Sequence, residues 1–389
     1  MHRETIIDYP SSIFDFQPIT RVVFGENTIN QLGKLTRELG AEHVLLVTDS
    51  GIVKAGHVEK AAGSLKQASI VGSIFEDVEE NPTTKHVTCG VAFAKKHLPI
   101  DVIIGLGGGS AMDCAKGINF ILSNGGKMED YWGVGKATKP MLPSIGIPTT
   151  AGTGSEAQSF ALIAQEKTHQ KMACGDKKAR FRTVILDPTL VKSVPKDVAG
   201  VTGIDAISHA VESYVSTKSN PYSRMYSKEA WRLLSKNYEI VLHEPENLQA
   251  WAEMQLGAHF AGMAIENSML GAAHACANPL TARFGITHGI AVGIMLPHVI
   301  KFNAQTVNGF YDELAETAGL KSDSGSASLV ARITELCEMN HLPMSLQDCH
   351  ISATELPELA EKAAQQWTSK FNPRPVGEMQ FLELYRQAF

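Results

Sequence analysis

The sequence lacks the features that mark a secreted, membrane-embedded or disulfide-rich protein. Its six cysteines are scattered through 389 residues and none forms a Cys-x-x-Cys pair. This favours reduced thiols in a cytoplasmic enzyme over a disulfide framework or a zinc ribbon. The most apolar window, residues 290–300, is too short to span a bilayer. No long apolar run follows the first residues, so the sequence predicts no signal peptide.

A strong charge of one sign is also lacking. The formal net charge is -6 and the sequence pI is about 6.2, whereas nucleic-acid-binding domains usually carry a basic face. We therefore expect neither a nucleic-acid partner nor a membrane. With 44% hydrophobic and 20% charged residues, the composition is that of a globular protein, and the length favours two domains.

The hydrophobic pattern divides the chain into two parts. In the first part, short apolar runs predict strands at 44–49, 70–75, 101–105, 144–148 and 183–186, with helices among them at 28–39 and 85–97. This alternation indicates a mainly parallel sheet covered by helices. Later, helical periodicity dominates, with helices predicted at 203–216, 222–234, 248–273, 307–318, 327–339 and 353–366. We predict an α/β nucleotide-binding domain, 1–192, and an all-α domain, 193–389, with a ligand cleft between them.

A glycine-rich segment directly follows the third predicted strand. Residues 105–116 read Gly-Leu-Gly-Gly-Gly-Ser-Ala-Met-Asp-Cys-Ala-Lys. Consecutive glycines expose backbone N–H groups to an anion, and Ser110 with Asp113 fits a helix N-cap and its capping box. The segment completes neither a Walker A loop nor Gly-x-Gly-x-x-Gly. It predicts a phosphate site at a helix N-terminus; a tight turn without a ligand is the alternative.

Two further strand ends carry polar side chains. Residues 149–156, Thr-Thr-Ala-Gly-Thr-Gly-Ser-Glu, follow the fourth predicted strand and offer N–H and hydroxyl donors to a diphosphate or a ribose. Asp49 ends the first predicted strand. A carboxylate there can bind an adenosine ribose and repel a 2′-phosphate, which favours NAD over NADP. A helix cap is the alternative for Asp49.

The helix predicted at 203–216 carries polar side chains on one face. Asp205 and His209 are four residues apart, so one cation can contact both, and Glu212 falls on the same face. A solvated helix face is the alternative.

Two further histidines, His274 and His288, lie among small or apolar residues, where an unpaired ring is costly to bury. On one straight helix they would be about 20 Å apart. We expect Pro279 and Gly285 to break that helix and let the chain fold back. One carboxylate and three imidazoles suit Fe²⁺, Zn²⁺, Co²⁺ or Ni²⁺ better than Ca²⁺ or Mg²⁺. For either histidine alone, a core residue bonded to a carbonyl is the alternative.

Taken in order, these pieces resemble the iron-containing (group III) alcohol dehydrogenases. The matching motifs extend over nearly the whole chain: Phe24-Gly25, Asp49, Asn81-Pro82, Gly107-Gly108-Gly109-Ser110 with Asp113 and Lys116, 148–156, Asp187-Pro188, 203–206 with His209 and Glu212, His274, Asn278-Pro279-Leu280, His288-Gly289, and 296–298 with Phe302-Asn303. Each motif is weak alone, whereas the ordered set is specific.

The resemblance implies a dehydroquinate synthase-like fold and hydride transfer between NAD and a metal-bound alcohol or aldehyde. It also implies iron as the metal and a homodimer or a larger homo-oligomer. By position it assigns the metal to Asp205, His209, His274 and His288. It assigns NAD contacts to Asp49, Asn81, Gly107, Gly108, Gly109, Ser110, Asp113, Thr149, Thr150 and Thr153.

One position departs from the family's pattern. Many relatives carry a second histidine four residues after the third ligand, near the substrate, and this chain has Asn278 there. Because an amide does not titrate, water, an external base or the ribose hydroxyl would relay the proton. Ile265 is a further candidate for lining the pocket. The departure bears on the substrate class more than on the reaction type.

Several alternatives stay open from the sequence. A metal-dependent lyase of the dehydroquinate synthase type would turn over without a net change in NADH absorbance. A glycerol-type dehydrogenase would use zinc. A metallohydrolase with a phosphate loop would need no nicotinamide. A non-catalytic binding protein is least favoured, because it would leave two anion loops and a ligand set without a use.

Overall fold

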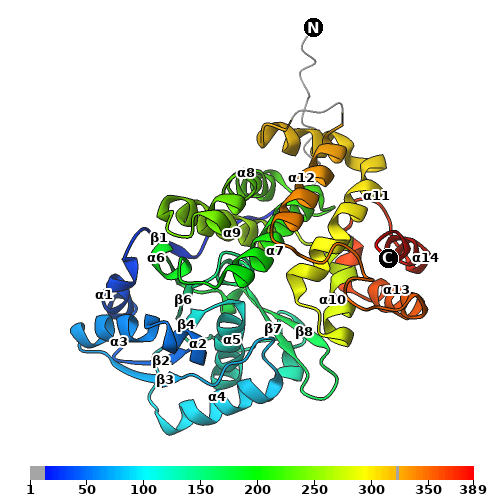
Figure 1. The fold of residues 1–389 in the computed structure, drawn as a ribbon. Helices are drawn as coiled ribbons and strands as arrows, with labels where there is room; N and C mark the ends of the chain where they lie inside the picture. Colours follow the sequence, from blue (N-terminus) through cyan, green and yellow to red (C-terminus); the bar gives the residue numbers. More distant parts are fainter. Residues whose placement is uncertain (1–13, 321–323) are drawn as a thin grey trace.

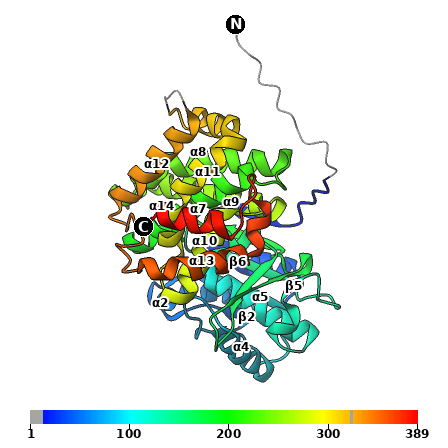
Figure 2. The same cartoon turned by 90° about the vertical axis from the view of Figure 1, so that its right-hand side faces the viewer.

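The computed structural model describes residues 14–320 and 324–389. Its N-terminal part is a parallel α/β domain, and its C-terminal part is a helical domain. The two parts lie at opposite ends of the molecule in Figure 1 and in Figure 2, which shows the view after a quarter turn. The predicted fold class is therefore confirmed. The predicted boundary between residues 192 and 193 stays a prediction.

A six-stranded parallel sheet, in the order β1-β9-β6-β4-β2-β3, forms the centre of the N-terminal domain. Its strands are β1 (Arg21–Phe24), β2 (His43–Val47), β3 (Val71–Phe75), β4 (Val102–Gly107), β6 (Ser144–Pro148) and β9 (Thr183–Leu186). Every residue of β4 and β6 is buried, as expected of central strands covered on both faces. The register pairs Gly107 with Pro148, so the loops after β4 and β6 start side by side.

Helices cover both faces of this sheet. They are α1 (Leu32–Glu38), α2 (Ser50–Lys54), α3 (His57–Gln67), α4 (Thr84–Lys96), α5 (Gly109–Asn124) and α6 (Pro188–Val191). Side chains alternate between the faces along β2. Val44 belongs to the core cluster that contains Leu35 of α1 and Leu65 of α3, whereas Leu45 belongs to the cluster that contains Val91 of α4 and Ile118 of α5.

A second, three-stranded sheet consists of β5 (Gly133–Val134), β8 (Lys171–Gly175) and β7 (Phe160–Ala164), in that order. β7 and β8 are antiparallel. The sequence did not predict these strands, or β1, because their polar and apolar residues do not alternate regularly.

The C-terminal domain contains α7 (Lys196–Val215), α8 (Pro221–His243), α9 (Leu248–Asn267), α10 (Ala272–Phe284), α11 (His288–Thr317), α12 (Gly325–Met339), α13 (Leu356–Ala364), the 3-10 helix η6 (Trp367–Phe371) and α14 (Glu378–Gln387). α7 lies at its centre and packs against α8, α9 and α11. The single helix predicted at 248–273 is wrong, because Ser268 leaves the helical conformation and its hydroxyl bonds the Ala264 carbonyl at 2.7 Å. No helix in the described ranges is long and apolar enough to cross a membrane.

Candidate metal and nucleotide site

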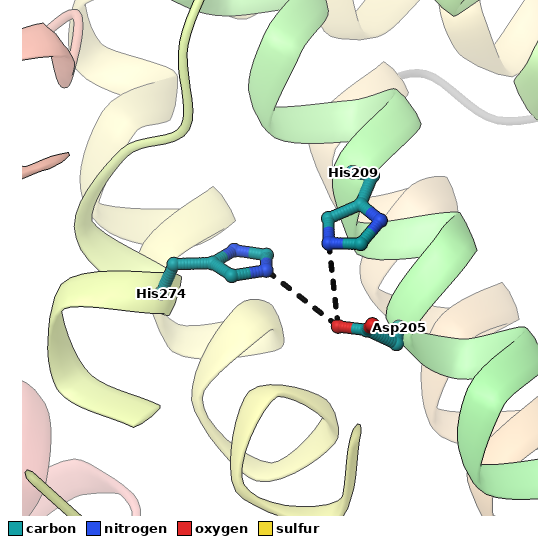
Figure 3. A group of neighbouring side chains, drawn as sticks. All are labelled: Asp205, His209 and His274. Carbon is teal, nitrogen blue, oxygen red and sulfur yellow. Dashed lines mark ion pairs between the residues drawn. The ribbon is translucent and has the colours of Figure 1, made fainter. Parts of the chain in front are cut away.

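Three histidines converge on one carboxylate oxygen. From Asp205 Oδ1, the Nε2 atom of His209 is 3.4 Å away, that of His274 is 3.6 Å away and that of His288 is 3.9 Å away. Figure 3 shows His209 and His274 directed at this oxygen from two helices. Asp205 and His209 lie one turn apart on α7, whose stripe of Ile204, Ile207, Val211 and Tyr214 is buried in the core. The structure thus brings the four predicted ligand residues together.

The turn between α10 and α11 places His288 beside His274. α10 ends at Phe284, Gly285 adopts a φ of 67°, and His288 is the first residue of α11. The expectation that Pro279 breaks this helix is wrong, because Pro279 lies buried inside α10. A proline removes one helical N–H, and packing in the core offsets that loss here. The chain therefore reverses in the turn at residues 285–287, where Gly285 adopts a positive φ.

The four side chains set one another's protonation. Burial raises the pKa of Asp205, but the neighbouring imidazoles outweigh it and hold that pKa well below its usual range. Burial lowers the pKa of His209 to about 4 and that of His288 to about 3. For His274, Asp205 and Glu212 overcome burial and raise the pKa to about 9. His209 and His288 are therefore neutral beside an ionised Asp205, and these are the protonation states that bind a metal ion.

Two atoms at the centre of the cluster fit a metal ion. Asp205 Oδ1 and His274 Nε2 are buried and have no hydrogen-bond partner among the described residues. Burying such atoms costs free energy unless a hydrogen-bond partner or a bound ion satisfies them. Asp205, His209 and His274 also offer ligand atoms that all lie within 4.8 Å of one another. A carboxylate with imidazoles is a donor set for a divalent transition metal.

Glu212 orients His274 within the cluster. Its Oε2 atom accepts the Nδ1–H of His274 at 2.5 Å, and its carboxylate also accepts the backbone N–H of Ala273 at 2.7 Å. A hydrogen bond at Nδ1 fixes the tautomer that leaves Nε2 free for a metal. Sequence reasoning put Glu212 on the ligand face of α7 but gave it no role. Its spacing of three residues from His209 was the available signal.

The glycine loop, Gly107–Ser110, connects β4 to α5. Gly107 has a φ of 148°, and a Cβ there would lie 2.8 Å from Ala111 Cβ, so this turn requires glycine. α5 begins at Gly109, with Gly108 as its N-cap. The first N–H groups of a helix have no partner within it, and they form a phosphate site where the loop leaves them uncovered.

The predicted capping box of Ser110 and Asp113 is wrong. Ser110 lies inside the first turn of α5, and Asp113 is buried. The Asp113 carboxylate accepts a hydrogen bond from the Ser155 hydroxyl and lies 3.6 Å from Lys116 Nζ. Lys116 is also buried and donates to the carbonyls of Ser155 and Phe160 at 2.7 Å each. A buried ammonium needs such partners, and this need turns Asp113 inward.

The threonine loop, Thr149–Ser155, connects the nucleotide side to the metal side. A Cβ at Gly109 would lie 2.7 Å from Thr153 Oγ1, so this loop presses against the glycine loop. Its Gly152 backbone raises the pKa of His209. Thr149 Oγ1 is buried without a hydrogen-bond partner in the described part of the chain, which leaves it free for a ligand.

Asp49 follows the end of β2, and Asn81 follows β3. Asp49 caps α2 by accepting from the N–H groups of Gly51 at 2.9 Å and Ile52 at 3.1 Å. Its other oxygen faces Gly107, because a Cβ there would lie 3.3 Å from Asp49 Oδ2. The cap and a place beside the glycine loop are therefore compatible. Asn81 is exposed and has a φ of 52°.

Sequence reasoning missed Lys171, which begins β8. Burial lowers the pKa of its amine, while Asp113 and Asp205 raise it. Its charge also lowers the pKa of His288. Lys171 therefore acts electrostatically on both the nucleotide helix and the metal cluster. The run Lys-Met-Ala-Cys at 171–174 offered only a weak strand signal.

Asn278 follows His274 by one turn of α10 and is partly exposed. Its side-chain N–H donates to Gln366 Oε1 at 3.1 Å. Gln366 lies 88 residues further along the chain, and sequence reasoning did not connect the two. Ile265, the weaker candidate, is buried near the end of α9.

A glycine loop at the N-terminus of α5 and a cluster of one carboxylate and three imidazoles are the features expected of an enzyme that binds a nucleotide and a metal ion. Two family models match the chain nearly end to end. "Iron-containing alcohol dehydrogenase" matches residues 19–188, and "Fe-containing alcohol dehydrogenase family, C-terminal" matches residues 199–389. The chain belongs to the iron-containing alcohol dehydrogenase family.

Individual relatives agree with this assignment. The 1,3-propanediol dehydrogenase of Klebsiella pneumoniae is 33% identical over 384 residues, which cover 97% of this chain and 99% of that protein. A solved 1,3-propanediol oxidoreductase has a TM-score of 0.93 at 33% identity, covering 97% of this chain and 100% of that one. Sulfoacetaldehyde reductase from Bifidobacterium kashiwanohense, solved with NAD⁺, has a TM-score of 0.88 at 26% identity, covering 97% and 99%.

These comparisons confirm the predicted family, the dehydroquinate synthase-like fold and the redox class. The chain is an NAD-linked alcohol dehydrogenase of a family that uses iron. The family match favours this reaction over the lyase and the metallohydrolase.

Proposed function

We propose that four residues of this chain, Asp205, His209, His274 and His288, hold the metal at which an alcohol is oxidised or an aldehyde reduced. The convergence of three Nε2 atoms on Asp205 Oδ1, at 3.4, 3.6 and 3.9 Å, carries the proposal. When bound, the metal supplies a Lewis acid to the substrate's oxygen and NAD supplies the hydride acceptor. We propose Fe²⁺ as the ion in the cell; Zn²⁺, Co²⁺ and Ni²⁺ suit the same donor set.

The two loops at the ends of β4 and β6 hold the nucleotide in this proposal. Gly107, Gly108, Gly109 and Ser110 present N–H groups to the diphosphate, and Thr149, Thr150 and Thr153 add hydroxyl groups beside them. Asp49 and Asn81 contact the adenosine end. Support comes from the register that starts both loops side by side and from the unpaired Thr149 hydroxyl. Asp113 acts through Ser155, because its carboxylate is turned into the interior.

The proton of the alcohol leaves without a titrating side chain at residue 278. The Asn278 amide neither accepts nor releases a proton, so water or the ribose hydroxyl of the cofactor relays it. The protein's contribution at this end is to position the substrate.

We also propose a homodimer or larger homo-oligomer in the cytoplasm. β1 is an edge strand of the main sheet, and its Val22 and Phe24 are 42% and 45% exposed. An exposed apolar edge strand favours pairing with another chain. All six cysteines are free thiols, which suits a reducing compartment. Light scattering at micromolar concentration tests the oligomeric state.

His274→Ala tests the metal assignment. We expect this variant to lose bound metal, measured by elemental analysis, and to lose NADH formation at 340 nm, while calorimetry still detects NAD binding. His243→Ala, at an exposed position on α8, is the matched control and should behave as the wild type. Full activity in a metal-free His274→Ala variant would disprove the assignment.

A further inference from the structure

The helix that carries His274 depends on other elements for its first hydrogen bonds. The N-cap residue of α10 is Gly271, which has no side chain to cap the helix. The first N–H groups of a helix have no partner within it, and the first three residues here, Ala272, Ala273 and His274, are buried. Leaving their N–H groups unpaired would cost free energy. Acceptors from elsewhere in the fold must therefore fix the start of α10.

Two side chains supply these acceptors. Glu212 of α7 accepts the N–H of Ala273 at 2.7 Å and the N–H of His274 at 3.4 Å. Asn372, which follows η6, accepts the N–H of Ala272 through its Oδ1 atom at 3.2 Å. A Cβ at the N-cap glycine would lie 2.9 Å from this Oδ1 atom and 3.0 Å from Glu212 Oε1, so glycine makes room for both acceptors. The carboxylate and the amide therefore cap α10 together.

A reciprocal pair of amides fixes the orientation of Asn372. Its Nδ2 group donates to Asn303 Oδ1 of α11 at 2.7 Å, and Asn303 Nδ2 donates to Asn372 Oδ1 at 3.0 Å. The Nδ2 group of Asn372 also donates to the Arg374 carbonyl at 2.7 Å. Both asparagines are buried, with exposed fractions of 4% for Asn372 and 1% for Asn303. A flipped Asn372 amide would turn its own N–H groups toward two donors, so Oδ1 stays directed at α10.

The segment that carries Asn372 is held on both sides. Thr217, two residues after the end of α7, donates its backbone N–H to the Phe371 carbonyl at 2.9 Å. Arg374 donates to the carbonyl of Phe302 on α11 at 2.8 Å and lies over its ring, 3.9 Å from the centroid. The acceptor for α10 is therefore fixed to α7 and α11, the two helices that carry the other three proposed ligands.

We propose that Asn372 and Asn303 are positioning residues for His274, which set the start of α10, and with it the His274 ring, relative to the metal cluster. Glu212 holds the ring and two N–H groups, whereas Asn372 fixes the helix start against its neighbours. This inference rests on the proposed function, because it needs His274 to be a metal ligand. A ligand that is held in place before the ion binds loses less freedom on binding. The two amides should therefore raise the affinity for the metal as well as the stability of the fold.

Asn372→Leu tests the proposal, because leucine has the same branching and lacks the polar atoms. The N–H of Ala272 then loses its acceptor. We expect the affinity for Zn²⁺, measured by competition with a chelator, to fall about 3- to 10-fold, the value of one neutral hydrogen bond. Calorimetry should show unchanged binding of NAD. Asn303→Leu leaves that acceptor in place and frees only its orientation, so it should give a smaller loss of Zn²⁺ affinity.

Asn237→Leu is the matched control, the same substitution at another buried asparagine. Asn237 lies on α8, is 2% exposed, and donates to Glu253 and to the Leu233 carbonyl at 2.8 Å each. This variant should lower the thermal midpoint of the metal-free protein and leave its Zn²⁺ affinity unchanged. All affinities are measured below the midpoints of the metal-free variants, so that unfolding does not mimic a loss of affinity.

The outcomes separate this inference from the function beneath it. An unchanged Zn²⁺ affinity in Asn372→Leu overturns the positioning role, and so does an equal loss in Asn237→Leu. If wild type binds no Zn²⁺, or if His274→Ala binds it as tightly as wild type, the proposed function itself fails. Should Asn372→Leu not fold, Asn303→Leu decides by the same criterion, because it does not touch α10.

Discussion

Glu212 performs two tasks with one carboxylate. It accepts the Nδ1–H of His274 and also the backbone N–H of Ala273, at the start of the helix that carries this ligand. α10 has no side-chain cap from its own N-cap residue, Gly271. The carboxylate therefore orients the ring and anchors the helix end at the same time.

Replacing Glu212 with Gln should weaken metal binding about 10- to 100-fold, the usual cost of losing a partner of a ligating histidine. The amide presents an acceptor on one side only, so one of the two hydrogen bonds is lost. Competition with a chelator of known affinity measures the change. Glu229→Gln, a surface pair with Arg232 on α8, is the control. An unchanged metal affinity in Glu212→Gln would show that the carboxylate serves the fold alone.

Single residues differ in how far the sequence predicts them. Asp205 and His209 follow from helical spacing, and the structure brings them together. His274 and His288 followed from the expected reversal of the chain at Pro279 and Gly285, of which only the part at Gly285 is correct, and the resemblance then assigned both as ligands. Lys171 was missed because it acts on the site from an element distant in sequence. Contacts of that kind are set by tertiary packing, which no local pattern records.

Among the secondary-structure elements, α9 and the threonine loop meet through two glycines. A Cβ at Gly262 would lie 2.5 Å from the Gly154 carbonyl oxygen, and one at Gly154 would lie 2.6 Å from Gly262 Cα. Gly154 also has a φ of 61°. The backbones of the two domains therefore touch at this point without intervening side chains.

Gly262→Ala should push the threonine loop away from α9. Backbone on both sides leaves the new methyl group no room, and overpacking of this kind costs about 1–3 kcal/mol. We expect a lower thermal midpoint and a KM for NAD raised several-fold. Gly309→Ala, on α11 with nothing within 4 Å of the added Cβ, should be neutral or slightly stabilising. Equal behaviour of the two variants would contradict the close approach.

Glu253 of α9 joins α8 and α9 by accepting hydrogen bonds from Gln249 at 2.9 Å and Asn237 at 2.8 Å. These bonds, with Lys236, lower its pKa from the ordinary 4.5 to about 2. A lowered carboxylate pKa stabilises the fold above pH 4.5, and this stabilisation is lost as the pH falls toward 2.

Glu253→Gln should therefore lower the urea midpoint at pH 7, by the equivalent of about 1 kcal/mol because the site is partly exposed. The difference from wild type should shrink as the pH falls from about 4.5 toward 2. Urea titrations followed by circular dichroism at several pH values measure it. A difference that stays constant over this range would show that Glu253 contributes by packing and not by charge.

The sequence predicted the elements with strong patterns. The five apolar runs correspond to β2, β3, β4, β6 and β9, all in the main sheet. The strands β1, β5, β7 and β8 were missed because their residues form no regular pattern, and their pairing with neighbouring strands is not recorded in any local pattern. The helix through Pro279 was missed for the opposite reason, since a local rule predicted a break that core packing overrides.

At the scale of the whole molecule, the metal cluster joins three helices. α7 carries Asp205 and His209, α10 carries His274, and α11 begins at His288. An ion that binds only the folded chain stabilises it by mass action, by about 2.7 kcal/mol at a free concentration 100 times Kd.

Removing the metal should therefore lower the thermal midpoint of wild type by several degrees, and adding Fe²⁺ or Zn²⁺ should restore it. Differential scanning fluorimetry before and after chelation gives both values. His274→Ala should show the low midpoint in both conditions. If the thermal midpoint of wild type also stayed the same when metal was added, the four side chains would not form one site.

The threonine loop has a consequence for how the two ligands influence each other. Its Gly152 backbone raises the pKa of His209 in the metal cluster, and its Thr153 lies against Gly109 of the glycine loop. A ligand at one site that moves this stretch would therefore change binding at the other. Thermodynamic reciprocity then requires that, if the ion raises the affinity for dinucleotide by some factor, dinucleotide raises the affinity for the ion by the same factor. An enzyme saturated with NAD would in that case bind its metal ion more tightly than the NAD-free enzyme does.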